Sequence, residues 1–207
     1  MKRAGAVLAL LGVLYSHAAA AQQNAEMAYE IRAGNPETEW IELIRKDVEK
    51  VPDRIQIALN KSGGRIIIFD GNITDNPEFE SYRGRTLPNR GLPYDVLDGK
   101  YLHRKAFVKQ KVFRYTGSIC VALHELGHMV DDVFGYPSES SEFMDTLNRS
   151  NKFYEGIEEP DQIWAESFAR FYYSGESNAS LRNNFPKLHG YFLNFESVIA
   201  SDARAPR

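Results

Sequence analysis

The chain has 207 residues, 43% of them hydrophobic, with 25 Lys and Arg against 28 Asp and Glu. This length and composition suit one globular domain with a hydrophobic core. The acidic excess argues against a protein that binds nucleic acid or anionic membranes, because such proteins usually carry a basic surplus. A single cysteine excludes a disulfide within the chain and a zinc site built from several thiolates.

Residues 1–21 have the pattern of a cleavable secretory signal peptide. Lys2 and Arg3 precede an apolar run over 4–15, which is too short to span a bilayer, and small residues follow at 18–21. A buried N-terminal helix is the alternative. Cleavage would leave 186 residues with 23 basic and 28 acidic side chains. No second long apolar run follows, so we expect a secreted or periplasmic protein without stable membrane insertion.

The first half of the remaining chain predicts two helices and a small sheet. Residues 22–35 are polar and predict a flexible N-terminal segment, after which apolar spacing behind Pro36 and Pro52 indicates two helices. The β-branched run over 65–69 predicts a strand. Residues 70–100 are rich in Gly, Pro and polar side chains and predict a long loop.

The second half predicts one more strand and then helices. Residues 101–115 mix aromatic, β-branched and basic side chains, which favours a single strand at a sheet edge. Four helices are expected after it, the first ending at Gly135 and the third at Gly175, over 118–134, 138–148, 160–173 and 185–199. Helices, a small sheet and further helices make an α+β fold, with one domain over 36–200 and a flexible tail over 201–207.

The strongest functional motif is His124-Glu125-Leu126-Gly127-His128, an H-E-x-x-H sequence in a predicted helix. Because helix residues four apart share a face, both histidines can present an imidazole nitrogen to one zinc ion. Glu125 lies one position round and can take a proton from a zinc-activated water. A chance match on a solvated helix is the alternative, but the flanking residues are apolar, and buried polar groups need partners.

A hydrolytic zinc ion usually has three protein ligands. Asp131 and Phe134 stand where the metzincin pattern requires Gly and His, so that class is excluded. Glu166, in the helix predicted over 160–173, is the candidate for the third ligand, because small residues beside it would allow a close approach to the first helix. From spacing alone, Glu166 could equally form an ordinary exposed ion pair with Arg170.

Other polar side chains near the motif have simpler explanations. Asp131 and Asp132 lie near a helix C-terminus, where they could accept a hydrogen bond from a zinc-bound histidine or be solvated. Cys120 could supply a thiolate, but a buried structural cysteine fits its surroundings better. His103 and His189 are isolated in the sequence, which favours surface or packing roles.

The stretch from about 37 to 173 resembles the metallopeptidase domain of the anthrax lethal factor family, which includes the secreted Pro-Pro endopeptidases. The matching segments are LNKSGGRIIIFD, YDVLDGKY, VALHELGHMVDD, SESSEF and IWAESFARFYY. The resemblance implies a zincin-like fold and a zinc-dependent endopeptidase. It assigns two histidines and a distant glutamate as ligands, which places the third ligand at Glu166.

One position departs from the family pattern. The family usually has an oxyanion-stabilising tyrosine about seven residues before the ligand glutamate, and Glu159 stands there in this chain. Tyr154 is the nearby phenol that could replace it, while Tyr136, Tyr172 and Tyr173 are other phenols. The alternative is that the donor is absent, which would lower activity.

These features predict an exported endopeptidase that binds one zinc ion per chain through His124, His128 and Glu166, with Glu125 as general base. Its partners would be peptide or protein substrates, and a strand within 101–115 could hold an extended peptide by strand addition. A secreted toxin-like or binding module with a structural or degenerate zinc site is the alternative. A small inhibitor or adhesin-like protein with a chance motif is a third possibility.

Overall fold

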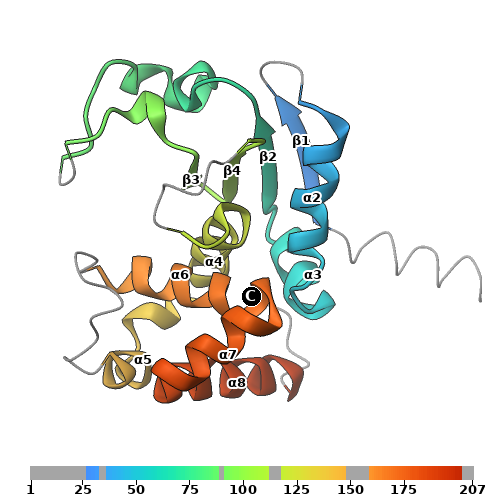
Figure 1. The fold of residues 1–207 in the computed structure, drawn as a ribbon, viewed down its shortest axis with the longest axis vertical. Coiled ribbons are helices and arrows are strands. Elements are labelled where there is room, and N and C mark those ends of the chain that lie inside the picture. Colours follow the sequence, from blue (N-terminus) through green and yellow to red (C-terminus); the bar gives the residue numbers. More distant parts are fainter. Residues whose placement is uncertain (1–26, 33–35, 89–90, 112–117, 148–158, 202–207) are drawn as a thin grey trace, which may run out of the picture.

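The computed structural model describes residues 27–32, 36–88, 91–111, 118–147 and 159–201 (Figure 1). The predicted signal peptide and Tyr154 lie outside these ranges, as does all but the first residue of the predicted tail. In the described part of the chain, no helix is long and apolar enough to cross a membrane.

A four-stranded mixed sheet forms one layer of the molecule. Its strands are β1 (Ala28–Arg32), β2 (Arg65–Phe69), β3 (Gly99–Leu102) and β4 (Lys105–Lys109), arranged in the order β1-β2-β4-β3. The β1–β2 and β2–β4 pairs are parallel, whereas β3 runs antiparallel to β4. The central strand β2 is the apolar run that the sequence predicted, and its last four residues are buried.

The prediction of a flexible segment over 22–35 is wrong for Ala28–Arg32, because these residues form β1. Strand β1 pairs in register with β2, which lies more than thirty residues further along the chain. Arg32, at the end of β1, donates two hydrogen bonds of 2.7 Å to the Glu78 carboxylate. Because β1 is stabilised by partners distant in the sequence, its own polar residues give little indication of a strand.

The prediction of one edge strand over 101–115 is also wrong. The segment forms the end of β3 and all of β4, joined by His103 and Arg104, which both adopt positive φ angles of 48° and 61°. Neither is the Gly or Asn that usually marks such a turn, so the hairpin has no clear sequence signal. Strand β3 is at the edge, and β4 lies inside the sheet.

Helices α2 (Thr38–Val48) and α3 (Asp53–Lys61) follow β1 and agree with the two helices predicted from the sequence. In its described residues, the predicted long loop between β2 and β3 forms three short 3-10 turns, which are Ile73–Asp75, Pro77–Tyr82 and Tyr94–Val96. Phe79 from this loop packs edge-on against Phe107 of β4, with ring centroids 4.9 Å apart. The loop therefore covers one face of the sheet with a small apolar cluster of its own.

The remaining described chain is helical, with α4 (Val121–Val133), α5 (Ser141–Thr146), α6 (Pro160–Tyr173), α7 (Gly175–Asn184) and α8 (Pro186–Ser201). A short 3-10 turn, Pro137–Glu139, precedes α5. Gly135 follows α4 with a φ angle of 81°, as its predicted role as a stop requires. Gly175 was predicted to end a helix, but it is the first residue of α7, and the Ser174 side chain caps that helix by accepting from the Ser177 N–H.

Helix α4 lies between the sheet and the C-terminal helices (Figure 1). Its contact with α6 is close, because a Cβ atom added to Gly127 would lie 2.9 Å from the Ala165 Cα atom. Trp164 of α6 is fully buried, and its indole N–H donates a 3.1 Å hydrogen bond to the Gly127 carbonyl. The predicted α+β class is confirmed, and the α4–α6 contact brings the conspicuous polar residues of both helices together.

Candidate active site

His124 and His128 lie one turn apart on α4, with ring centroids separated by 5.0 Å and planes at 79°. Their side chains are 14% and 10% exposed. The opposite face of the helix is apolar and packs into the core, where Leu123, Leu126 and Val130 are fully buried. Burial of that face fixes the rotation of α4, so both imidazoles face α6, where Glu166 and Gln162 contact them. We refer to this polar junction of His124, His128, Gln162 and Glu166 as the groove.

Glu166 of α6 faces the same groove and is only 2% exposed. One carboxylate oxygen lies 3.4 Å from His124 Nδ1. The other lies 2.9 Å from Arg170 Nε and accepts a 3.3 Å hydrogen bond from the Ile119 N–H. The two sequence interpretations of Glu166 are therefore both partly realised: it pairs with the half-buried Arg170, but its own carboxylate is buried beside a histidine.

Glu125 faces the edge strand β3 and is 7% exposed. The backbone N–H of Tyr101 donates a hydrogen bond to its carboxylate. Gly99 permits this approach, because a Cβ atom there would come within 2.9 Å of Glu125 Cγ and Oε1. Burial raises the pKa of Glu125, with the positive charges of His124 and Lys100 opposing this shift. A carboxylate with a raised pKa is suited to exchange protons near neutral pH.

The two histidines differ in their affinity for a proton. Burial alone would lower the pKa of His124, but hydrogen bonding to Glu166 and the charges of Glu125 and Glu166 outweigh it and raise that pKa. Burial and the neighbouring charge of His124 lower the pKa of His128 well below its usual value. His128 is therefore neutral at pH 7, which is the form that binds a metal ion.

Gln162, which the sequence did not single out, lies beside both histidines. It precedes Glu166 by one turn of α6, and its amide nitrogen is 3.0 Å from His128 Nε2. A further hydrogen bond links its side chain to His124. Gln162 belongs to none of the sequence motifs that indicated the site. The only signal in the sequence was its spacing of four from Glu166, which places both on one helix face.

Tyr101 and Asp132 form a second cluster next to His128. The Tyr101 ring stacks on the His128 ring at a centroid distance of 6.4 Å and an angle of 19°. Its hydroxyl donates to Asp132, which also accepts a 2.9 Å hydrogen bond from the Tyr136 hydroxyl. Asp132 therefore does not contact His128 directly: it bonds to Tyr101, whose ring stacks on His128. Asp131 is turned away, and its carboxylate accepts from the Ser138 N–H at 2.8 Å and hydroxyl at 2.6 Å.

The other candidate side chains lie outside the groove. The Cys120 thiol donates a 3.4 Å hydrogen bond to Asp47, and burial together with that carboxylate raises the pKa of Cys120 to about 12. It is thus a protonated packing residue. His103 stands in the β3–β4 turn, and His189 contacts the Asn178 amide at 3.0 Å.

Zinc prefers the donor types present in the groove, namely two imidazoles and a buried carboxylate. In the described part of the chain, however, no three His, Cys, Asp or Glu side chains converge closely enough to hold a metal ion as they stand. The contacts already described explain this spread: Glu166 is turned to Arg170 and Ile119, and Gln162 lies against His128. The donor chemistry fits zinc.

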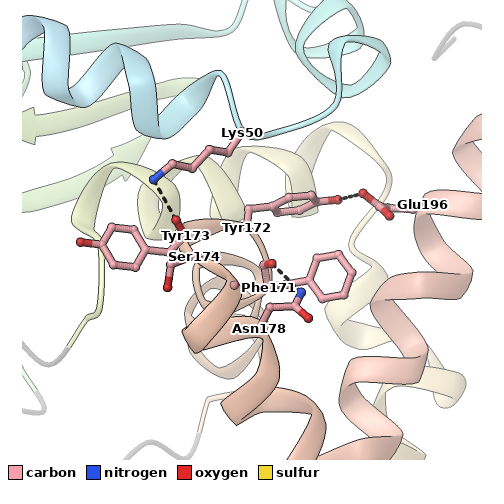
Figure 2. A pocket seen from close by; sticks show the side chains of 8 residues that line it. Lys50, Phe171, Tyr172, Tyr173, Ser174, Asn178 and Glu196 are labelled. Carbon is pink, nitrogen blue, oxygen red and sulfur yellow. Dashed lines mark hydrogen bonds between the residues drawn. The ribbon is translucent and has the colours of Figure 1, made fainter.

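A separate pocket lies at the C-terminal end of α6 (Figure 2). Its polar groups are paired with one another: Lys50 donates to the Tyr173 carbonyl, Tyr172 to Glu196, and Asn178 to the Phe171 carbonyl. It contains none of the proposed metal ligands and not the proposed base, but two of the phenols noted in the sequence, Tyr172 and Tyr173, line it. We interpret it as a junction between helices.

The fold and the groove together define an α+β protein in which an H-E-x-x-H helix packs against a helix that carries a buried glutamate. The sequence family described as anthrax toxin lethal factor, N- and C-terminal domain, matches residues 22–195. The chain belongs to this family. The resemblance stated from the sequence motifs is thereby confirmed.

Comparison with individual proteins agrees with this membership. The chain is 26% identical to a Pro-Pro endopeptidase of Paenibacillus alvei over 69% of this chain and 71% of that protein. It is 25% identical to a Pro-Pro endopeptidase of Clostridioides difficile over 66% of this chain and 67% of that protein. The solved structure of the Pro-Pro endopeptidase PPEP-2 from Paenibacillus alvei is similar in fold, with a TM-score of 0.71 and 22% identity over 81% of this chain and 96% of that one. These relatives support a peptidase as the general class.

Proposed function

We propose that this protein is an exported, zinc-dependent endopeptidase. The observation that carries the proposal is the junction of α4 and α6, where the buried Glu166 lies 3.4 Å from His124 and His128 follows one turn later, while a β3 backbone N–H bonds to Glu125. The signal-peptide pattern over 1–21 supports secretion or periplasmic export. The names of the relatives make peptides with adjacent prolines the first substrates to test.

In this proposal His124, His128 and Glu166 would hold one zinc ion. When bound, zinc would acidify a water molecule and polarise the scissile carbonyl. Glu125 accepts the proton of that water as the water oxygen attacks the carbonyl carbon. The carbon–nitrogen bond then breaks, and Glu125 returns the proton to the leaving amine, so that a carboxylic acid and an amine are formed.

The burial of Glu125 supports its role as the base. A carboxylate in water has a pKa near 4 and holds a proton poorly at neutral pH. Removal from water raises the pKa of Glu125 toward the working range, and the Tyr101 N–H keeps the carboxylate oriented. These contacts come from β3, so the edge strand helps to position the proposed base.

The substitution Glu125→Gln tests the mechanism. It should reduce kcat about 10²–10⁴-fold, the usual contribution of a positioned acid–base group, while zinc content stays near one per chain. The measurements are digestion of a peptide library containing adjacent prolines, with and without a chelator, and zinc analysis of the purified proteins. His128→Ala serves as the comparison, because it should lose zinc as well as activity.

The alternative function is a secreted binding or toxin-like module with a structural or degenerate zinc site. Its support is that Glu159 stands where the family usually has the oxyanion-stabilising tyrosine. A wild-type protein that retains zinc through dialysis but cleaves no member of the library would support this alternative. Peptide cleavage by the Glu125→Gln variant at the wild-type rate would refute the proposed mechanism.

A further inference from the structure

The side chain of Gln162 occupies the space between the two histidines of the groove. Its amide nitrogen lies 3.0 Å from His128 Nε2, and the same side chain forms a hydrogen bond with His124. Gln162 belongs to α6, so it reaches these rings from the opposite wall, one turn before Glu166. One neutral amide therefore touches both proposed histidine ligands.

The local hydrogen bonds indicate which atom Gln162 presents. The Gln162 amide nitrogen donates a 3.3 Å hydrogen bond to Asp161 as well as contacting His128. An amide nitrogen can only donate, so the 3.0 Å contact is a hydrogen bond from Gln162 to His128 Nε2. Gln162 thus presents its N–H groups directly beside a proposed zinc ligand, close to where a substrate carbonyl would react in the proposed function.

Peptide hydrolysis needs such a donor. The carbonyl oxygen gains negative charge as water adds, and a hydrogen-bond donor that is already in position stabilises this charge. Glu125 and Glu166 are acceptors, and the Tyr101 hydroxyl is held by Asp132. Of the groove residues described above, Gln162 is the neutral side chain with an N–H directed at the histidines.

We propose that Gln162 is a catalytic residue whose side-chain amide donates a hydrogen bond to the carbonyl oxygen of the scissile peptide bond as that oxygen becomes negatively charged. This inference rests on the proposed function. The inference predicts that, when metal and substrate bind, the Gln162 amide breaks its hydrogen bond to His128 and donates to the substrate oxygen instead. Gln162 then contributes to the rate of reaction, whereas metal binding depends on His124, His128 and Glu166.

The test compares Gln162→Ala with Gln162→Glu in the full chain. Both should lower kcat about 10²–10³-fold on a cleaved adjacent-proline peptide, the usual cost of losing one oxyanion donor, with KM within about threefold of wild type. Gln162→Glu should be at least as slow, because a carboxylate repels the developing charge. Zinc affinity, measured by competition with a chelating dye, should weaken by no more than about threefold in Gln162→Ala.

Two further variants make the comparison specific. Asn184→Ala also replaces an amide on a helix, but Asn184 is exposed and bonds only to Ser180 of its own helix, so this variant should keep wild-type kcat. Tyr154→Phe removes the phenol that the sequence suggested as the donor. If Tyr154→Phe shows the large loss in kcat and Gln162→Ala does not, the inference about Gln162 is overturned.

The zinc measurement separates the remaining outcomes. A loss of kcat in Gln162→Ala that comes with tenfold weaker zinc binding would identify Gln162 as a support for the metal ligands and overturn the proposed donor role. If wild-type protein binds zinc and cleaves peptide and the Gln162→Ala variant is equally active, the inference about Gln162 is refuted and the proposed function stands. Wild-type protein that cleaves no peptide refutes the proposed function and this inference with it.

Discussion

Glu125 is held in place by residues of the neighbouring edge strand, and Gly99 is the most restrictive of them. A side chain at position 99 would overlap Val121 Cγ1 and come within 2.9 Å of Glu125. Strand β3 can therefore lie directly on α4 only if position 99 has no Cβ atom. The placement of the proposed base depends on a glycine that carries no chemistry of its own.

The substitution Gly99→Ala should therefore disturb both stability and activity. Overpacking of a tight contact typically costs about 1–3 kcal/mol, and displacement of the Glu125 carboxylate should also lower kcat. Urea unfolding and peptide cleavage measure the two effects. Gly190→Ala in α8 is the control, because nothing lies within 4 Å of its added Cβ atom and alanine favours a helix by about 1 kcal/mol. Equal stability of both variants would contradict this account.

At the residue scale, the sequence was informative where the chemistry is carried by one segment. The H-E-x-x-H spacing placed His124 and His128 on one face, and the structure has them with ring centroids 5.0 Å apart. Glu166 remained open between two interpretations, because spacing within α6 does not say which face is covered. Gln162 was missed, since its importance arises only when α6 lies against α4.

The contact between α4 and α6 is the element-scale feature on which the groove depends. Gly127, inside the H-E-x-x-H motif, lets the two helix backbones approach, and Ala165 is the residue it meets. The hydrogen bond from the Trp164 indole to the Gly127 carbonyl fixes the register of this contact. A change in helix separation would move Glu166 relative to His124.

The substitution Gly127→Ala tests this dependence. Alanine should favour the helix by about 1 kcal/mol. Its Cβ atom, however, would lie 2.9 Å from the Ala165 Cα atom, and a backbone atom cannot move aside as a flexible side chain can. We expect net destabilisation by about 1–2 kcal/mol and weaker zinc binding. Thermal unfolding and dye competition measure these quantities, and a variant more stable than wild type would show that the helices can separate freely.

A charge cluster links the sheet to the long loop. Glu78 of the loop accepts hydrogen bonds from Arg32 of β1 and, at 2.6 Å, from Lys105 of β4. Burial alone would raise the pKa of Glu78, but the hydrogen bonds from Lys105 and Arg32 outweigh it and lower that pKa to about 2. The ionised carboxylate therefore joins an N-terminal strand, an internal strand and the loop.

Glu78→Gln should therefore destabilise the protein in a pH-dependent way. The pKa of Glu78 is lower in the folded state than its ordinary value of 4.5, so the carboxylate stabilises the fold above about pH 4.5. This contribution is lost as the pH falls from 4.5 toward 2. With solvent screening, we expect a cost of about 1–2 kcal/mol at pH 7. Urea unfolding at several pH values should show the two proteins converging in acid; a constant difference would contradict the assignment.

For the whole molecule, metal binding should couple the two helical walls of the groove and stabilise the fold. A ligand that binds only the folded state at 100 times its Kd adds about 2.7 kcal/mol to the free energy of unfolding. For a domain of this size, that corresponds to a rise in Tm of about 5–10 °C. Scanning calorimetry with zinc and with a chelator measures the shift. His128→Ala should show almost none, and an equal shift in that variant would mean that zinc binds elsewhere.

The sequence by itself determined the features that arise within single segments. The helical periodicity around H-E-x-x-H, the apolar strand β2 and the turn at Gly135 each depend on neighbours a few residues apart, and each appears in the structure where it was predicted. The family resemblance also followed from local motifs, which retain their order along the chain. These features are local because backbone conformation and helix faces are set by nearby side chains.

Only the tertiary structure decided which segments meet. Strand β1 is ordered by parallel pairing with β2, and the β3–β4 hairpin turns through two residues that do not signal a turn. The pairing of Glu166 with both His124 and Arg170, and the place of Gln162 between the histidines, depend on the close approach of α4 and α6. Such contacts join residues distant in sequence, and they are selected by burial and shape across the whole core rather than by any local pattern.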